Sequence, residues 1–144
     1  MRRLLPLLPC VLVLAACGGG DGKSGVEEGG SKAGVAPVCE GQNRAVPKSF
    51  TGFPFPEGSV LTQSRLEEGA TVVEGFVRDK SLAEVRDEVR DALPKAGYEL
   101  LEGDAEEHEA ETDFKGHAKY GHLKLRDDVC KDAVSFGVAV RSAS

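Results

Sequence analysis

The chain has 144 residues and a net charge of −6 at pH 7, with 24 acidic against 18 basic side chains. This charge disfavours nucleic acid as a partner and favours a cation, a metal ion or a basic protein surface, although acidity also serves solubility alone. The sequence contains no Gly-rich phosphate loop, no H-E-x-x-H and no G-x-S-x-G motif. We therefore expect a protein that is not an enzyme and that needs no cofactor.

Residues 1–16 have the three parts of an export signal. Arg2 and Arg3 form a basic head, residues 4–14 are apolar, and two small residues precede Cys17. The apolar stretch is too short to span a hydrocarbon core, which needs about 20 residues as a helix. The sequence therefore predicts a signal that is cleaved rather than a permanent transmembrane anchor.

The sequence Leu14-Ala15-Ala16-Cys17 resembles the lipobox of bacterial lipoproteins. The resemblance implies that Cys17 takes a thioether-linked diacylglycerol and becomes the first residue of the mature protein. Its acyl chains, typically palmitate, would anchor the protein to the extracytoplasmic face of the cell membrane or to the outer membrane. Two or three chains suffice, because each buried CH₂ contributes about 0.8 kcal/mol. The alternative is an ordinary signal whose cleavage site lies beside a cysteine.

Residues 17–36 are predicted to be a tether. They are rich in Gly, Ser, Lys and Glu and cannot bury enough apolar surface to offset the entropy of ordering. A flexible chain of this length has a typical reach of roughly 25 Å. Loss of the signal removes two arginines and no acid, so the mature chain would carry a charge of −8. Residues 37–144 then form one small domain.

Two cysteines remain for that domain. Cys10 leaves with the signal and Cys17 is lipidated, so Cys39 and Cys130 are left. Outside the cytoplasm an isolated pair is expected to form a disulfide, worth about 4 to 5 kcal/mol for a loop this long. A metal-thiolate site is the alternative, but it would lack the closely spaced C-x-x-C pairs typical of zinc sites.

The domain begins with an extended segment, residues 43–59, in which three prolines alternate with Phe50, Phe53 and Phe55. These phenylalanines are expected either to cap an edge of the core or to form the aromatic lip of a pocket. The next two stretches, residues 60–66 and 71–78, are rich in β-branched side chains around a Glu-Glu-Gly turn. They predict a β-hairpin.

A helix is predicted from Leu82 to about Ala96. Ser81 and Glu84 match a capping box, and apolar residues recur on one face at helical spacing. Pro94 should kink or shorten the last turn, and Gly97 suits the left-handed stop that follows a helix.

Four further strands are predicted at residues 98–102, 109–114, 118–126 and 133–141. In the second of these, acids alternate with less polar residues, so one face should be wet and acidic. The predicted fold class is therefore α+β. We expect an antiparallel sheet of five or six strands with one helix packed across one face, in the order ββα followed by four strands.

Residues 54–141 resemble the small uncharacterised α+β lipoprotein domains of high-GC bacteria. The resemblance lies in Pro54-Phe55-Pro56-Glu57-Gly58, in the helix closing on residues 93–98 and in the final valine strand. It implies the fold and brings no assigned activity.

His108, His117 and His122 lie among several carboxylates. They could bind zinc or a similar divalent ion if three or four ligands converged. The odd interval between His117 and His122 places them on opposite faces of a regular strand, so convergence would need a bulge at Gly121. Otherwise they are solvated histidines near turns.

Two functions therefore remain from the sequence. One is a non-enzymatic binding or structural module that docks on an envelope protein. The other is a metal or small-cation binder that uses the three histidines. Geometry should distinguish them, because the first needs an apolar surface open between helix and sheet and the second needs converging histidines.

Overall fold

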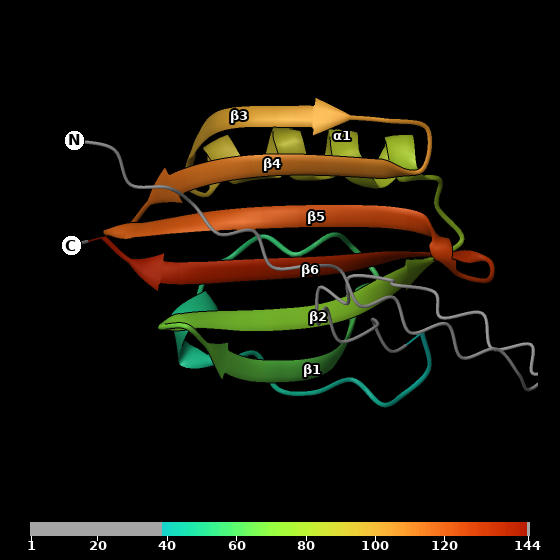
Figure 1. The fold of residues 1–144 in the computed structure, drawn as a ribbon, viewed down its shortest axis with the longest axis horizontal. Coiled ribbons are helices and arrows are strands. Elements are labelled where there is room, and N and C mark those ends of the chain that lie inside the picture. Colours follow the sequence, from blue (N-terminus) through green and yellow to red (C-terminus); the bar gives the residue numbers. More distant parts are fainter. Residues whose placement is uncertain (1–38, 144) are drawn as a thin grey trace, which may run out of the picture. The chain divides into compact units, whose positions relative to one another are not determined.

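The computed structural model describes residues 39–143, drawn in colour in Figure 1. The predicted signal, the lipidation site Cys17 and the tether of residues 17–36 lie outside the described residues. A short 3-10 turn and seven longer elements follow one another along the chain: η1 Lys48–Phe50, β1 Val60–Glu67, β2 Ala70–Arg78, α1 Leu82–Lys95, β3 Glu99–Ala105, β4 Glu109–Gly116, β5 Lys119–Cys130 and β6 Ala133–Ser142.

The strands form one open antiparallel sheet in the order β1-β2-β6-β5-β4-β3. The predicted α+β class with one helix is confirmed. The predicted element order omitted the turn η1, whose three residues are too few to show a helical period. The last strand, β6, lies between β2 and β5, so it joins the first hairpin to the later strands in the middle of the sheet (Figure 1).

The helix covers only part of one face, because the strands that it contacts most are β3, β4 and β5. Six strands about 4.8 Å apart make a sheet roughly 24 Å wide, whereas a helix is about 10 Å across. In Figure 1, α1 lies behind β3 and β4, and the segment before β1 passes behind β6 and β2. The predicted helix across one face is therefore present, and it covers the part of that face formed by β3, β4 and β5.

The segment before β1 covers the other half with its phenylalanines. Phe50 and Phe53 are only 1% and 7% exposed, and Phe55 packs against the same core. The ring of Phe53 lies 5.4 Å from that of Phe114, and the ring of Phe55 lies 6.0 Å from that of Phe136. These residues belong to the core rather than to the lip of a pocket.

Two glycines make room for those sheet phenylalanines. Phe114 of β4 lies opposite Gly121 of β5, where an added Cβ would stand 2.1 Å from the ring. Phe136 of β6 lies opposite Gly75 of β2, where a Cβ would stand 2.7 Å from the ring and 2.2 Å from the carbonyl oxygen of Val60. Each ring therefore covers the backbone of a neighbouring strand.

Both ends of α1 follow the sequence signals. The Ser81 hydroxyl accepts a hydrogen bond from the Glu84 amide at 3.3 Å, and the Glu84 carboxylate accepts one from the Ser81 amide at 2.8 Å. At the other end Gly97 has φ of 85°, and the Tyr98 amide donates to the carbonyl of Leu93 at 3.0 Å. The helix ends at Lys95, directly after Pro94, one residue before the predicted end.

The predicted hairpin is formed by β1 and β2, with positive φ at Glu68 and Gly69 in the turn. The strands β3 and β5 are longer than predicted. β3 continues to Ala105 although most of its side chains are exposed, and β5 continues to Cys130 across an irregularity in its pairing with β6. Backbone pairing with a neighbour, rather than an apolar pattern, sets these strand ends.

Cys39 and Cys130 are joined in a disulfide, with Cα atoms 5.4 Å apart. The bridge connects the first described residue to the end of β5. A second small cluster surrounds it, made of Phe76, Cys130 and Ala133 with the partly buried Cys39, Val60 and Val129. Phe76 directly precedes Val77 of the main core on β2, and successive side chains of a strand point to opposite faces, so this cluster lies on the opposite face of the sheet.

We expect Gly121→Ala to lower the free energy of unfolding by about 1 to 3 kcal/mol, because its Cβ would collide with the fully buried Phe114 ring. Gly137→Ala is the matched control, since its Cβ would meet only Glu74 Cγ at 3.9 Å. Chemical denaturation of both variants provides the measurement. Equal stability of the two would show that the ring does not rest on the β5 backbone.

Replacing Cys39 and Cys130 together by serine should lower the free energy of unfolding by about 4 kcal/mol, because the bridged residues are 91 positions apart. Denaturant titration of the mature protein measures this loss. Wild-type protein with reductant should converge on the double variant, and the double variant should not respond to reductant. Alkylation of Cys39 or Cys130 in denatured, unreduced protein would contradict the bridge.

Candidate functional site

The three histidines lie in separate places. His108 precedes β4, with Nδ1 2.9 Å from Oδ1 of Asp127. His117 is in the β4–β5 turn, with Nε2 2.8 Å from the carbonyl oxygen of Ala96. His122 is on β5, with Nδ1 2.7 Å from Oδ1 of Asp113.

These positions do not create the metal site considered from the sequence. The pairing of β4 with β5 is regular through Gly121, so the bulge needed to bring His117 and His122 together is absent from this hairpin. Within residues 39–143, no group of three or more His, Cys, Asp or Glu side chains is placed to hold a metal ion.

The predicted acidic face of β4 is present, but its carboxylates form ion pairs with basic side chains of β5. Nζ of Lys124 lies 2.7 Å from Oε1 of Glu109 and 2.7 Å from Oε1 of Glu111. The Lys124 ammonium holds the pKa of Glu111 below its ordinary value, with a smaller contribution from His122. A lysine therefore already stands where the sequence suggested that a small cation could bind.

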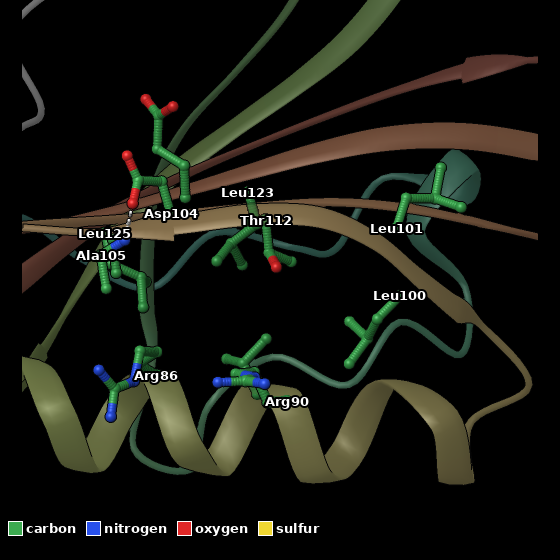
Figure 2. Close-up of a pocket in the computed structure, with 13 residues that line it drawn as sticks. Arg86, Arg90, Leu100, Leu101, Asp104, Ala105, Thr112, Leu123 and Leu125 are labelled. Carbon is green, nitrogen blue, oxygen red and sulfur yellow. Dashed lines mark hydrogen bonds between the residues drawn. The ribbon is translucent and has the colours of Figure 1, made fainter.

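A cleft opens on the other face, between α1 and the β3 edge of the sheet (Figure 2). We call it the α1–β3 cleft. Its volume is about 260 Å³, and its lining comes from α1, β3, β4 and β5: Arg86, Val89, Arg90, Leu100, Leu101, Gly103, Asp104, Ala105, Ala110, Glu111, Thr112, Leu123 and Leu125.

Small residues leave this space open. Gly103 pairs with Thr112, and Ala105 pairs with the buried Ala110, so the strands carry little bulk opposite the first turns of α1. Toward the other end of the helix, Tyr98 and Phe114 fill the same layer, with rings 5.4 Å apart. The cleft is therefore a gap in the helix–sheet packing at one end only.

The acidic side chains that line the cleft point away from it, and the basic ones do not have such contacts with the sheet. Figure 2 shows Leu100 and Thr112 pointing toward α1, whereas Asp104 lies on the far side of β3 and accepts a hydrogen bond from the Ala105 amide at 2.8 Å. Glu111 is held by Lys124 on the opposite face. Arginines of α1 are therefore the charged groups that remain at the mouth.

Those arginines differ in their partners. Arg86 uses Nε and Nη2 to contact Oδ1 of Asp87 at 2.9 and 2.8 Å. Arg90 has no ion pair or side-chain hydrogen bond within the described part of the chain, and neither does the hydroxyl of Thr112. Two polar groups at the cleft are thus left for solvent or a ligand.

Neither arginine, and no cleft beside the helix, was predicted from the sequence. A signal was present, because Arg86 and Arg90 are four residues apart and each directly follows a buried valine, Val85 or Val89. They stand at the boundary between the buried and the exposed face, where a long side chain can reach the rim of a groove.

No protein-family model, no curated protein and no solved structure matches the chain. Among the described residues, no helix is both long and apolar enough to cross a membrane.

The pH dependence of stability should include a contribution from His108. Its contact with the Asp127 carboxylate raises the pKa of His108, so the charged form is favoured in the folded protein. The stabilisation is complete below the ordinary pKa of about 6.5 and is lost as the pH rises through the raised pKa.

Asp127→Asn should bring the pKa of His108 back toward its ordinary value, measured by NMR titration of the imidazole, and should remove this part of the pH dependence. Asp113→Asn, which contacts His122 instead, is the matched control and should leave His108 unchanged. An unaltered His108 titration in Asp127→Asn would contradict the assignment.

Proposed function

We propose that this chain is a lipid-anchored lipoprotein of the extracytoplasmic membrane face and that its domain is a non-enzymatic binding module of the cell envelope. The observation that carries the binding role is the α1–β3 cleft, of about 260 Å³, beside a helix that covers only half of the sheet. The lipobox resemblance at Cys17 supports the location.

The groups that face the cleft suit binding better than catalysis. The lining consists of aliphatic side chains, the Thr112 hydroxyl and, along the helix, Arg86 and Arg90, whereas the carboxylates of Asp104 and Glu111 are turned to partners of their own. A guanidinium stays protonated in proteins and donates hydrogen bonds, so it can hold an anion but cannot act as a general base. Apolar walls with a few polar groups are the usual composition of a ligand site.

The alternative from the sequence, metal or small-cation binding through His108, His117 and His122, gains no support from the geometry. Each histidine has a different neighbour, and Lys124 occupies the acidic strand. The expected envelope protein partner stays part of the proposal, and the α1–β3 cleft is the surface we offer for recognition.

We expect Cys17→Ser to abolish acylation and to stop cleavage by the lipoprotein signal peptidase. Incorporation of labelled palmitate and the size of the product in membrane and soluble fractions are the measurements. Cys10→Ser is the matched control, because it changes a cysteine within the signal and should leave acylation intact.

A Cys17→Ser protein that matures to normal size and stays with the membrane would contradict the anchor. Uncut precursor can remain in the membrane fraction through its apolar signal, so the acyl label decides that case. Label on Cys17→Ser would also contradict the proposed site.

A further inference from the structure

We infer that the α1–β3 cleft binds a small amphipathic carboxylate, with its apolar body between α1 and the sheet and its carboxylate on Arg90. This inference rests on the proposed binding function and specifies the chemical class of the ligand. Three observations carry it: the apolar walls, the uneven charge at the mouth and the protected edge of β3.

The side chains that line the cleft favour a ligand whose apolar part is small. Val89, Ala110, Leu123 and Leu125 are each no more than 3% exposed and line the cleft from three elements. Drug-sized ligands occupy pockets of roughly 300 to 1,000 Å³, so about 260 Å³ suits a smaller molecule.

The opening of the α1–β3 cleft favours a negatively charged ligand group, although the protein as a whole is acidic. Arg86 and Arg90 are four residues apart on α1, so their side chains leave the same side of the helix. The nearest carboxylates that line the cleft, Asp104 and Glu111, are directed elsewhere by their own hydrogen bonds. A guanidinium can form two parallel hydrogen bonds with a carboxylate, which makes Arg90 the natural contact.

Thr112 adds a hydroxyl inside the cleft. It points toward α1 in Figure 2 and has no side-chain hydrogen bond among residues 39–143. This hydroxyl is therefore a second hydrogen-bond donor, beside the guanidinium of Arg90, for an oxygen atom of the ligand.

The alternative ligand is a peptide that pairs as an additional strand with β3, but the features of this edge strand disfavour such pairing. The pairing of β3 with β4 is irregular between Leu100 and Gly103, and Asp104 uses its carboxylate on the Ala105 amide. Glu99 and Glu102 place further charge on the same short strand. Bulges and charges of this kind protect an edge strand from pairing with another chain.

The test uses the full lipoprotein in isolated membranes and a photoreactive analogue of octanoic acid, in which a diazirine is carried on the alkyl chain. The amide and the amine of the same alkyl body are the matched neutral and cationic probes. After irradiation, digestion and mass spectrometry locate the labelled residues, and unlabelled octanoate is added as a competitor.

We expect the acid to label peptides containing residues 86–90 and 100–112 and octanoate to suppress that labelling. The amide and the amine should need about tenfold higher concentration for the same labelling, and Arg90→Gln should impose a similar loss on the acid, because a charge-assisted hydrogen bond is removed. Arg44→Gln, next to β1 at the opposite edge of the sheet, is the matched control.

Ala105→Trp should abolish labelling by all three probes, because the indole would fill the cleft from an exposed position without removing a core side chain. Circular dichroism and the intact disulfide would show that this variant is folded.

The outcomes separate the two proposals. Equal labelling by acid, amide and amine, with no effect of Arg90→Gln, would overturn the carboxylate inference and leave the binding module standing. Absence of label in the cleft peptides, or labelling unaffected by Ala105→Trp, would overturn the inference and remove the cleft as a site for small ligands, whereas docking of an envelope protein would still need its own test. Displacement of the acid by an extended peptide but not by octanoate would overturn the inference in favour of strand addition.

Discussion

The width of the sheet is the constraint on which the rest of this domain depends. Six strands present a face that one helix of 14 residues covers only in part, so the remaining apolar surface must be covered by something else. Phe50, Phe53 and Phe55 supply that cover, and each fully buried phenylalanine contributes about 1.5 to 3 kcal/mol. The ring contacts pass from this segment to Phe114 and Phe136, so the segment before β1 is part of the core rather than a connection to it.

The two faces of the sheet also differ in how their charged side chains are paired. On the open face, Lys124 lies between Glu109 and Glu111, Arg126 contacts Asp128, and Arg65 contacts the buried Glu74 at 2.9 Å. Those charges are held in ion pairs with one another, so a charged ligand would have to displace a side chain to bind there. On the helix side, Arg90 stands beside a gap in the packing with no such partner among the described residues. The structure therefore favours ligand binding on the helix side of the sheet, although the acidic side chains of β4 lie on the open face.

The sequence was most informative where the responsible residues are neighbours in the chain. The hairpin turn at Glu68-Gly69, the capping box of Ser81 and Glu84, and the left-handed Gly97 all depend on local spacing. The position of β6 between β2 and β5 could not be obtained in this way, because it depends on which distant strands pair. β3 was underestimated because an exposed edge strand carrying three acids has no apolar alternation to reveal it.

The cleft was missed for a related reason. It results from small residues on two strands, Gly103, Ala105 and Ala110, standing opposite one end of a helix. In the sequence each of these is an ordinary small residue, and only the cross-strand register shows that they adjoin. The histidines illustrate the opposite case, since closeness in the sequence suggested a site that the β4–β5 pairing separates.

The disulfide has a mechanical consequence. Because Cys39 is bonded to Cys130, a pull applied at the N-terminal end of the domain enters β5, which has a strand on either side, and not β1 at the edge. Residues 40–59 then lie off the load path, so the aromatic segment that completes the core is shielded from tension. Peeling β1 from the sheet would require the bridge to break first, and the domain should resist extension from that end as a single block.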